Sequence, residues 1–296
     1  MKALLAFLLC IVCFASIGIL KNYVRDVPSA FLAFGRLAIS LALFAVIFRG
    51  KIRKPKNARM WVSFAVSGLF YAMAFWLYLE AFGHASVPDI ALIGFVDPLF
   101  ATLLAFFVLK ERVTPFAFGA IALAAIGMYF LLAFPSGASS DNLGIALALL
   151  AFVAGSANTV LARWEERHSA PLVEVVFYPF AFGAAFLLVP ALLQAPSVAM
   201  LGAGQWAVVL LMGAATTAGY FLYDRLMQKY GAHTTDLAAR AGITFVATAG
   251  AAALLGQGIG QHWIAAAAFL FGAAYLIYLE AMEAGKKFVP RHGHTH

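Results

Sequence analysis

Long apolar segments separated by short hydrophilic breaks follow one another along the whole chain. Each segment is about 18–23 residues long, the length that a helix needs to cross the hydrocarbon core of a membrane. Continuous apolar runs such as Ala101–Leu109 and Ile121–Phe134 do not fit the alternating pattern of a membrane β-barrel. The pattern predicts ten helical spans: Ala3–Leu20, Ser29–Phe48, Met60–Phe82, Ile90–Leu109, Phe116–Phe134, Leu143–Trp164, Leu172–Gln194, Gly204–Met227, Asp236–Leu255 and His262–Met282.

Basic residues are sorted among the breaks. Sixteen of the 20 Lys and Arg fall in every second break, six of them in Arg49–Arg59 alone. Positively charged short loops stay on the cytoplasmic side of a membrane. The pattern predicts a multi-pass protein of the cell inner membrane with both termini in the cytoplasm. The net charge of +7 then reflects topology and contact with anionic lipid, and no nucleic-acid partner is expected.

Composition excludes a soluble protein. Hydrophobic residues make up 64% of the chain and charged residues 11%, with a mean hydropathy of +0.91. No polar stretch is long enough to form a soluble domain beside a single anchor. Cys10 and Cys13 lie one helical turn apart in the first span and predict neither a disulfide framework nor a metal site. The histidines of the last residues are expected to belong to a tail or a cloning remnant. No cofactor is predicted.

The two halves of the chain echo each other. Gly83–Gly119 and Gly231–Ala265 each begin with a glycine turn, continue through a span rich in small residues and reach a polar break. Pro28 precedes the second span as Pro171 precedes the seventh. Each copy holds five spans. Because five is an odd number, the second copy must enter the membrane from the opposite side, which is the inverted repeat of many secondary transporters. The expected divisions are 1–134 and 143–282 for the repeats and 283–296 for a cytoplasmic tail.

Three stretches resemble a known family. They are Phe14–Leu41, with a lysine ending the first span and an arginine in the second; Tyr78–Tyr129, with Pro98 in the fourth span; and Gly219–Ala239. In order and spacing they are similar to the EamA-type ten-helix carriers of the drug/metabolite transporter superfamily. The resemblance implies alternating-access transport of a small polar organic metabolite. The chain departs from the family at Thr244, where a proline is expected, at Gln257, where an acidic residue is usual, and at Glu80, where a small residue is usual.

Charged residues within spans are the first candidates for a substrate site, because each costs at least about 2.5 kcal/mol at mid-membrane. Arg36 and Asp97 lie at similar predicted depths in the second and fourth spans and could pair. The pair is either structural or grips a zwitterion, with Arg36 on the carboxylate and Asp97 on the ammonium. Asp97 is also a candidate proton carrier. Pro98 predicts a break in the helix and a carbonyl left free to face the cavity.

Other candidates carry open alternatives. Arg240 either pairs with Asp236 one turn away or lines the inner half of the path. Glu80 either reaches water at the outer end of its span or selects the substrate. Glu174 is expected to be solvated.

Packing is the common role of a single aromatic residue, but polar and aromatic groups within spans can also contact a substrate. The neutral candidates are Asn158, Trp76, Tyr178, Tyr71, Tyr220 and Tyr223. Pro179 is expected to be a second hinge or helix break.

The favoured function is secondary active transport, with export of amino acids or related metabolites as first choice. Uptake of a vitamin or nucleotide-like compound and a non-transporting scaffold or sensor are the alternatives. A membrane enzyme is disfavoured because HExxH and GxSxG are absent, and ATP hydrolysis because no GxxxxGK[ST] loop is present. Protons are a candidate coupling ion, and the protein is expected to be a monomer or homodimer.

Overall fold

A computed structural model describes residues 2–55, 57–110, 115–133, 141–168, 170–194, 201–230, 232–260 and 263–287. For 2–3, 224, 227–230, 232–234, 236–237, 280–281 and 283–287 it describes the backbone alone.

The described chain is helical throughout. The elements are α1 (Lys2–Tyr23), α2 (Ser29–Ile47), α3 (Ala58–Ala81), α4 (Val87–Ile93), the 3-10 turn η1 (Gly94–Val96), α5 (Asp97–Leu109), α6 (Pro115–Ala133), α7 (Asn142–Arg167), α8 (Leu172–Leu193), α10 (Ala203–Tyr230), α11 (Ala232–Leu255) and α12 (Trp263–Lys287). Nine described segments are long and apolar enough to cross a membrane, and α12 holds a shorter apolar stretch, Trp263–Leu279. The predicted all-α membrane protein is confirmed, and nine of the ten predicted spans are long and apolar enough to cross a membrane among the described residues. α12 continues to Lys287, so the predicted tail begins as helix.

Local chemistry explains where several helices begin. The side chains of Asn57, Ser86 and Asp141 each accept a hydrogen bond from a backbone N–H in the first turn of α3, α4 and α7. These bonds satisfy donors that have no partner within the helix. Pro28 and Pro171 occupy the matching position before α2 and α8. The ends of the apolar segments therefore coincide with capping signals.

The fourth span is broken in its middle. α4 ends at Ile93, the turn Gly94–Val96 follows, and α5 restarts at Asp97 with Pro98 in its first turn. The carbonyl of Gly94 accepts the backbone N–H of Asp97, so the carbonyl expected to be free has a partner, and that expectation is wrong. A proline fits the first turn of a helix because its missing N–H would have no partner there. Because of this break, Asp97 is the first residue of a new helix in the middle of the span.

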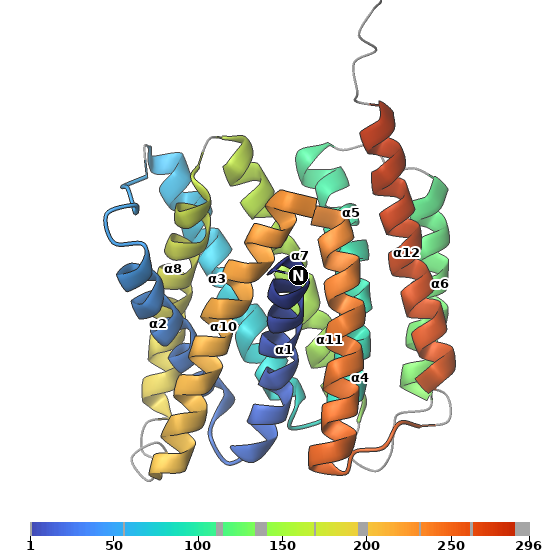
Figure 1. Cartoon of the computed structure of the whole chain (residues 1–296), viewed down its shortest axis with the longest axis horizontal. Helices are drawn as coiled ribbons and strands as arrows, with labels where there is room; N and C mark the ends of the chain where they lie inside the picture. Colours follow the sequence, from blue (N-terminus) through green and yellow to red (C-terminus); the bar gives the residue numbers. More distant parts are fainter. Residues whose placement is uncertain are drawn as a thin grey trace, which may run out of the picture.

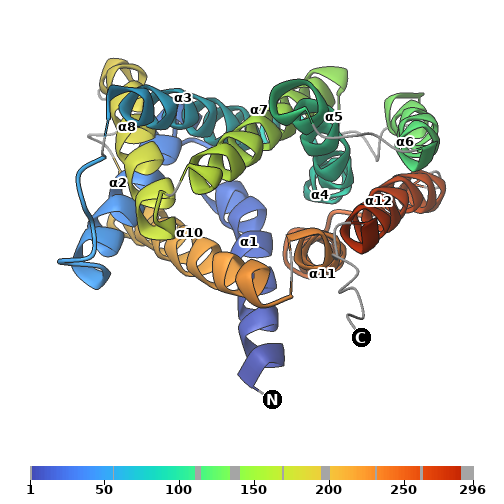
Figure 2. The same cartoon turned by 90° about the horizontal axis from the view of Figure 1, so that it is seen from above.

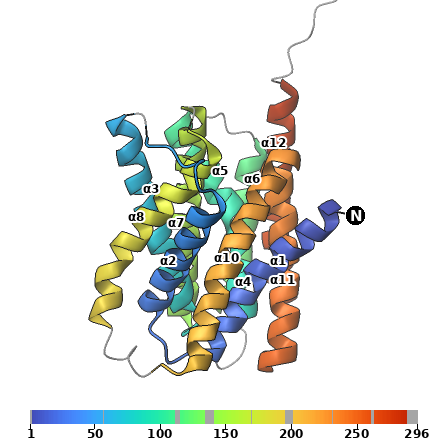
Figure 3. The same ribbon diagram turned by 60° about the vertical axis from the view of Figure 1, so that its left-hand side comes forward.

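The helices form one bundle whose two halves interlock (Figures 1 and 2). α1 packs against α10 and α11, and in the same way α7 packs against α3 and α5. α2 packs against α8, while α6 and α12 pair at one edge of the bundle (Figure 2). α1 is tilted so that its N-terminal end projects from the bundle (Figure 3). Every contact between halves named here thus has a counterpart when the halves are exchanged.

The chain turns from α2 to α3, from α7 to α8 and from α10 to α11 at the same end of the bundle, which is the top in Figure 1. These are breaks that hold the basic residues of the sequence pattern. Close helix contacts rely on glycine: a Cβ added to Gly68 of α3 would lie 2.4 Å from Phe182 Cβ and 2.9 Å from two backbone atoms of α8. Gly68 therefore sets the distance between α3 and α8.

Candidate functional site

A cavity of about 400 Å³ lies between the two halves of the bundle. Its walls come from α1 to α5 of the first half and from α7, α8, α10 and α11 of the second. Its ionisable and amide-bearing walls include Arg36, Asp97, Asn158, Arg163, Glu166 and Arg240. A volume of this size suits a small organic molecule.

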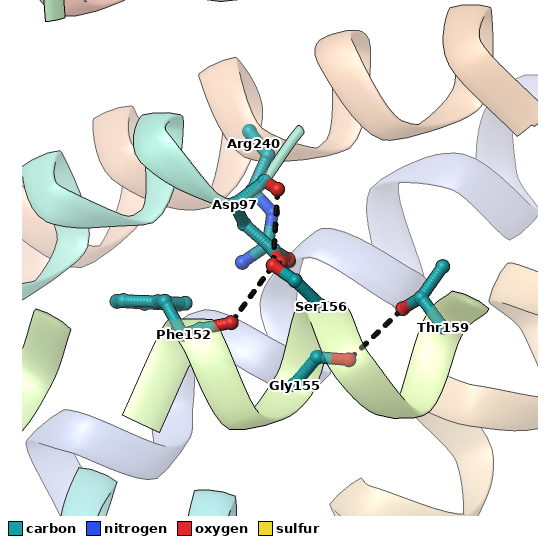
Figure 4. A network of polar contacts seen from close by, with 6 residues as sticks. All are labelled: Asp97, Phe152, Gly155, Ser156, Thr159 and Arg240. Atoms are coloured by element: carbon teal, nitrogen blue, oxygen red, sulfur yellow. Dashed lines mark hydrogen bonds and ion pairs between the residues drawn. The ribbon is translucent and has the colours of Figure 1, made fainter. Parts of the chain in front are cut away.

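Asp97 is held by groups of the second half (Figure 4). Its Oδ2 forms an ion pair with Arg240 of α11, and its Oδ1 contacts the hydroxyl of Ser156 in α7. The same hydroxyl lies 3.0 Å from the Asp97 carbonyl oxygen and 2.9 Å from that of Phe152, whose ring lies 5.4 Å from the Arg240 guanidinium carbon. Both carboxylate oxygens of Asp97 are therefore occupied, and the pair expected with Arg36 is not formed.

Arg36 is 2% exposed and reaches the cavity from α2. Its Nε donates to Thr216 Oγ1 at 3.1 Å, and its guanidinium carbon lies 4.4 Å from the centre of the Phe75 ring. Its Nη1 has no hydrogen-bond partner. Among the described residues no carboxylate pairs with Arg36, so its charge is opposed only by hydroxyl and ring dipoles.

Aromatic rings surround this arginine. Tyr220 lies with its ring centre 5.8 Å from Tyr71, 6.1 Å from Phe75 and 5.2 Å from Phe14, mostly edge to face. Tyr78 interacts electrostatically with both Arg36 and Arg240. All of these rings line the cavity. Tyr78 is therefore close to both arginines in a pocket with flat apolar walls.

The cavity reaches the turn between α7 and α8, where Arg163, Glu166 and Leu172 line it. At the opposite end of the bundle the two halves are joined by direct contacts. The backbone N–H of Val87 donates to Gln257 Oε1 at 3.0 Å, and His84 Nδ1 lies 3.3 Å from Asp141 Oδ2. The departure from the family at Gln257 thus supplies a contact between halves.

Asp141 caps α7 at this closed end. The backbone N–H of Gly144 and, to a smaller degree, the ring of His84 hold the pKa of the Asp141 carboxyl below its ordinary value. The carboxylate is therefore stabilised first by the start of its own helix, α7, and second by His84 of the other half.

Four predicted site residues lie away from the cavity walls. Trp76 is 36% exposed on the outside of α3, and Glu80 is half-buried and interacts electrostatically with Lys21. The hydroxyl of Tyr178 donates to the Arg53 carbonyl oxygen at 2.9 Å and so holds the connection before α3. α8 continues through Pro179 without a break. Hydropathy assigned these residues to positions along their helices, but it does not indicate which side of a helix faces the cavity.

Asn158 lies on the cavity wall and is 6% exposed, and its Oδ1 has no hydrogen-bond partner. Glu174, expected in water, is 5% exposed. The side chain of Asp236 lies outside the described residues, so its pairing with Arg240 stays a prediction. The same holds for the histidines at the C-terminus.

Sequence reasoning missed Glu165. It is fully buried in α7, and its Oε1 accepts hydrogen bonds from Ser63 at 2.7 Å and Ser67 at 2.9 Å. Its Oε2 has no partner. Two serines one helical turn apart in α3 were the available signal, since hydroxyls at that spacing share one face. This contact ties α3 to α7 behind the cavity wall.

No group of three or more potential metal ligands occurs among the described residues.

Comparisons with known proteins agree with this architecture. Residues 1–133 match the model of the EamA-like transporter family. The uncharacterized transporter YyaM of Bacillus subtilis (strain 168) is 27% identical over 226 residues, which is 73% of each chain. A crystal structure of another protein aligns with 96% of this chain and 98% of its own at a TM-score of 0.65, with 21% identity, which is a likeness of fold alone.

Proposed function

We propose that the chain is a secondary carrier of the EamA-like transporter family that moves a small organic metabolite by alternating access. The match to this family and the nine described candidate spans support a multi-pass membrane transporter and not an enzyme. The identity of the substrate, the direction of transport and the orientation of the protein in the membrane are likewise proposed.

The observation that carries the proposal is the cavity between the halves. It reaches one end of the bundle at Arg163 and Glu166, while contacts between Val87 and Gln257 join the halves at the other end. A carrier needs this asymmetry, because its site must be accessible from one side at a time. Transport then requires that the closed end separate and the open end close around the substrate.

The reciprocal packing of the halves supports an inverted repeat. α1 contacts α10 and α11 as α7 contacts α3 and α5, so exchanging the halves reproduces the same set of contacts. Such a pair can pass between two arrangements of similar energy that are related by exchanging the conformations of the two halves. The basic breaks at one end of the bundle support placing that end, and both termini, in the cytoplasm of an inner membrane.

The substrate that fits this cavity carries a carboxylate, since Arg36 lines the cavity without a carboxylate partner among the described residues. Amino acids and the organic acids formed from them by loss of the amino group both carry this group, and the protein is proposed to export one of these two classes. Asp97 and Arg240, joined across the halves, would line the path and respond to its rearrangement.

Proteoliposomes test the proposal. They are loaded with labelled amino acids and with the organic acids formed from them by loss of the amino group, and then diluted. We expect at least one label to leave faster than from protein-free liposomes, with saturation, and Arg36→Gln to abolish the difference. Arg25→Gln is the matched control, because Arg25 is exposed and bonds to Asn22. Equal loss with and without protein for every label would refute the carrier. Right-side-out and inverted membrane vesicles then give the direction.

A further inference from the structure

The charges on the cavity wall do not cancel. Its described lining includes three arginines, at 36, 163 and 240, and two carboxylates, Asp97 and Glu166. Asp97 pairs with Arg240, and Arg163 interacts with Glu166 one turn further along α7. These two pairs leave the positive charge of Arg36. Among the described lining residues the net formal charge is therefore one positive unit before any substrate enters.

The carboxylate of Asp97 is already used. One oxygen meets Arg240 and the other meets Ser156, and the residue is 8% exposed. A substrate ammonium group at Asp97 would have to displace the Arg240 guanidinium from this carboxylate. Removing one partner from a buried ion pair is costly. The geometry thus disfavours the zwitterion grip in which Asp97 holds an ammonium group.

Arg36 is the opposite case. A buried guanidinium is stable only when its N–H groups find acceptors, and its Nη1 has none. A planar carboxylate matches the fork of an arginine better than other ligands do. The missing partner is therefore an anion, and the cavity is the route by which it arrives.

The walls beside Arg36 are flat and apolar. Phe14, Tyr71, Phe75 and Tyr220 form a set of rings in contact, and Phe75 already covers one face of the guanidinium. Rings of this kind accept an aromatic or other flat body by stacking and edge contacts. The carboxylate would then be bound at one end of the substrate and the flat body among the rings.

We infer that the substrate class is an organic monocarboxylate anion with a flat apolar body and no ammonium group, its carboxylate bound by Arg36. Asn158 adds an acceptor for a hydroxyl substituent, since its buried Oδ1 has no partner on the same cavity wall. This inference rests on the proposed carrier function and narrows its substrate. It differs from amino-acid export in excluding the ammonium group.

Ligands that share one aromatic body and differ in their charged or polar group test it. Hydrocinnamate (an anion), hydrocinnamamide (neutral), phenethylamine (a cation) and phenylalanine (a zwitterion) share a phenyl body, and indolepropionate, its amide, tryptamine and tryptophan repeat the set with an indole. Each is titrated against the purified full-length protein, with the shift in melting temperature as readout. We expect the two anions to bind about tenfold to hundredfold more tightly than their amides, which corresponds to one charge-assisted interaction.

Variants locate the effect. Arg36→Gln should abolish the preference for the anion and still fold, since it removes a buried charge without a carboxylate partner; Arg36→Lys should retain a weaker preference, and Arg25→Gln should leave it unchanged. Tighter binding of phenylalanine and tryptophan than of the anions would overturn the substrate class but leave the carrier standing, as flux from proteoliposomes is measured separately. Absence of a shift with both anions, or equal binding to Arg36→Gln, would also overturn the inference.

Discussion

Replacing Asp97 by Asn and Arg240 by Gln, singly and together, measures how strongly their ion pair joins α5 to α11. Asp97 is 8% exposed, while the side chain of Arg240 keeps 23% exposure on the cavity side. Each single replacement removes one side of this ion pair and leaves the other charge in place. The double replacement removes both charges, so its cost should lie well below the sum of the two single costs.

The magnitude follows from the burial of the pair. Loss of one partner from a fully buried pair costs about 3–5 kcal/mol. Two charges in contact gain about 4 kcal/mol at an effective dielectric constant of about 20. Because Arg240 keeps part of its exposure in the cavity, we expect each single replacement to cost about 3 kcal/mol, the low end of the range. The expected coupling energy is then about 2–3 kcal/mol.

Titration of the protein with SDS in mixed micelles gives the free energy of unfolding for each variant. The control combines Asp97→Asn with Arg163→Gln, an arginine on the same cavity wall that interacts with Glu166 instead. The control pair should be additive. If Asp97→Asn and Arg240→Gln were themselves additive within about 0.5 kcal/mol, the ion pair between the halves would be refuted.

Three further predictions use the same unfolding titration. Gly68→Ala should cost about 1–3 kcal/mol because the added Cβ meets the α8 backbone at 2.9 Å, whereas Gly155→Ala, with open space around its Cβ position, should be close to neutral; equal costs would contradict the packing. Glu165→Ala should cost about 1–3 kcal/mol more than Glu165→Gln, which keeps an acceptor for both serines, and no difference would contradict the buried contact. The pKa of Asp141 is lowered by its bond to the start of α7 and then by His84, so the stability that Asp141→Asn removes should be present at neutral pH and be lost as the pH falls below the ordinary Asp value of about 3.9; a difference independent of pH would contradict this.

The spans could be predicted closely because a bilayer imposes a strict length on every apolar helix. The broken fourth helix was also readable, since Pro98 cannot continue a hydrogen-bonded helix and fits a first turn instead. Arg36, Asp97, Asn158 and Arg240 were singled out because polar groups within spans need partners or water, and all four line the cavity.

Partners were not predictable in the same way. Arg36 and Asp97 share a predicted depth, yet Asp97 forms its ion pair with Arg240 from the other half. This partner could not be predicted because hydropathy carries no information on which helices face each other. Trp76 was expected to contact the substrate, but it is 36% exposed and does not line the cavity. In a membrane the outer surface of a helix is as apolar as its packed surface, so the pattern that separates the two in a soluble helix is weak.

Counterflow of labelled hydrocinnamate into proteoliposomes tests most directly the claim that Arg36 anchors an anionic substrate in a cavity between alternating halves. We expect saturable uptake by the wild type and by Arg25→Gln, and uptake by Arg36→Gln no greater than that by protein-free liposomes. Uptake by Arg36→Gln at the wild-type rate, or wild-type uptake equal to that of protein-free liposomes, would contradict it.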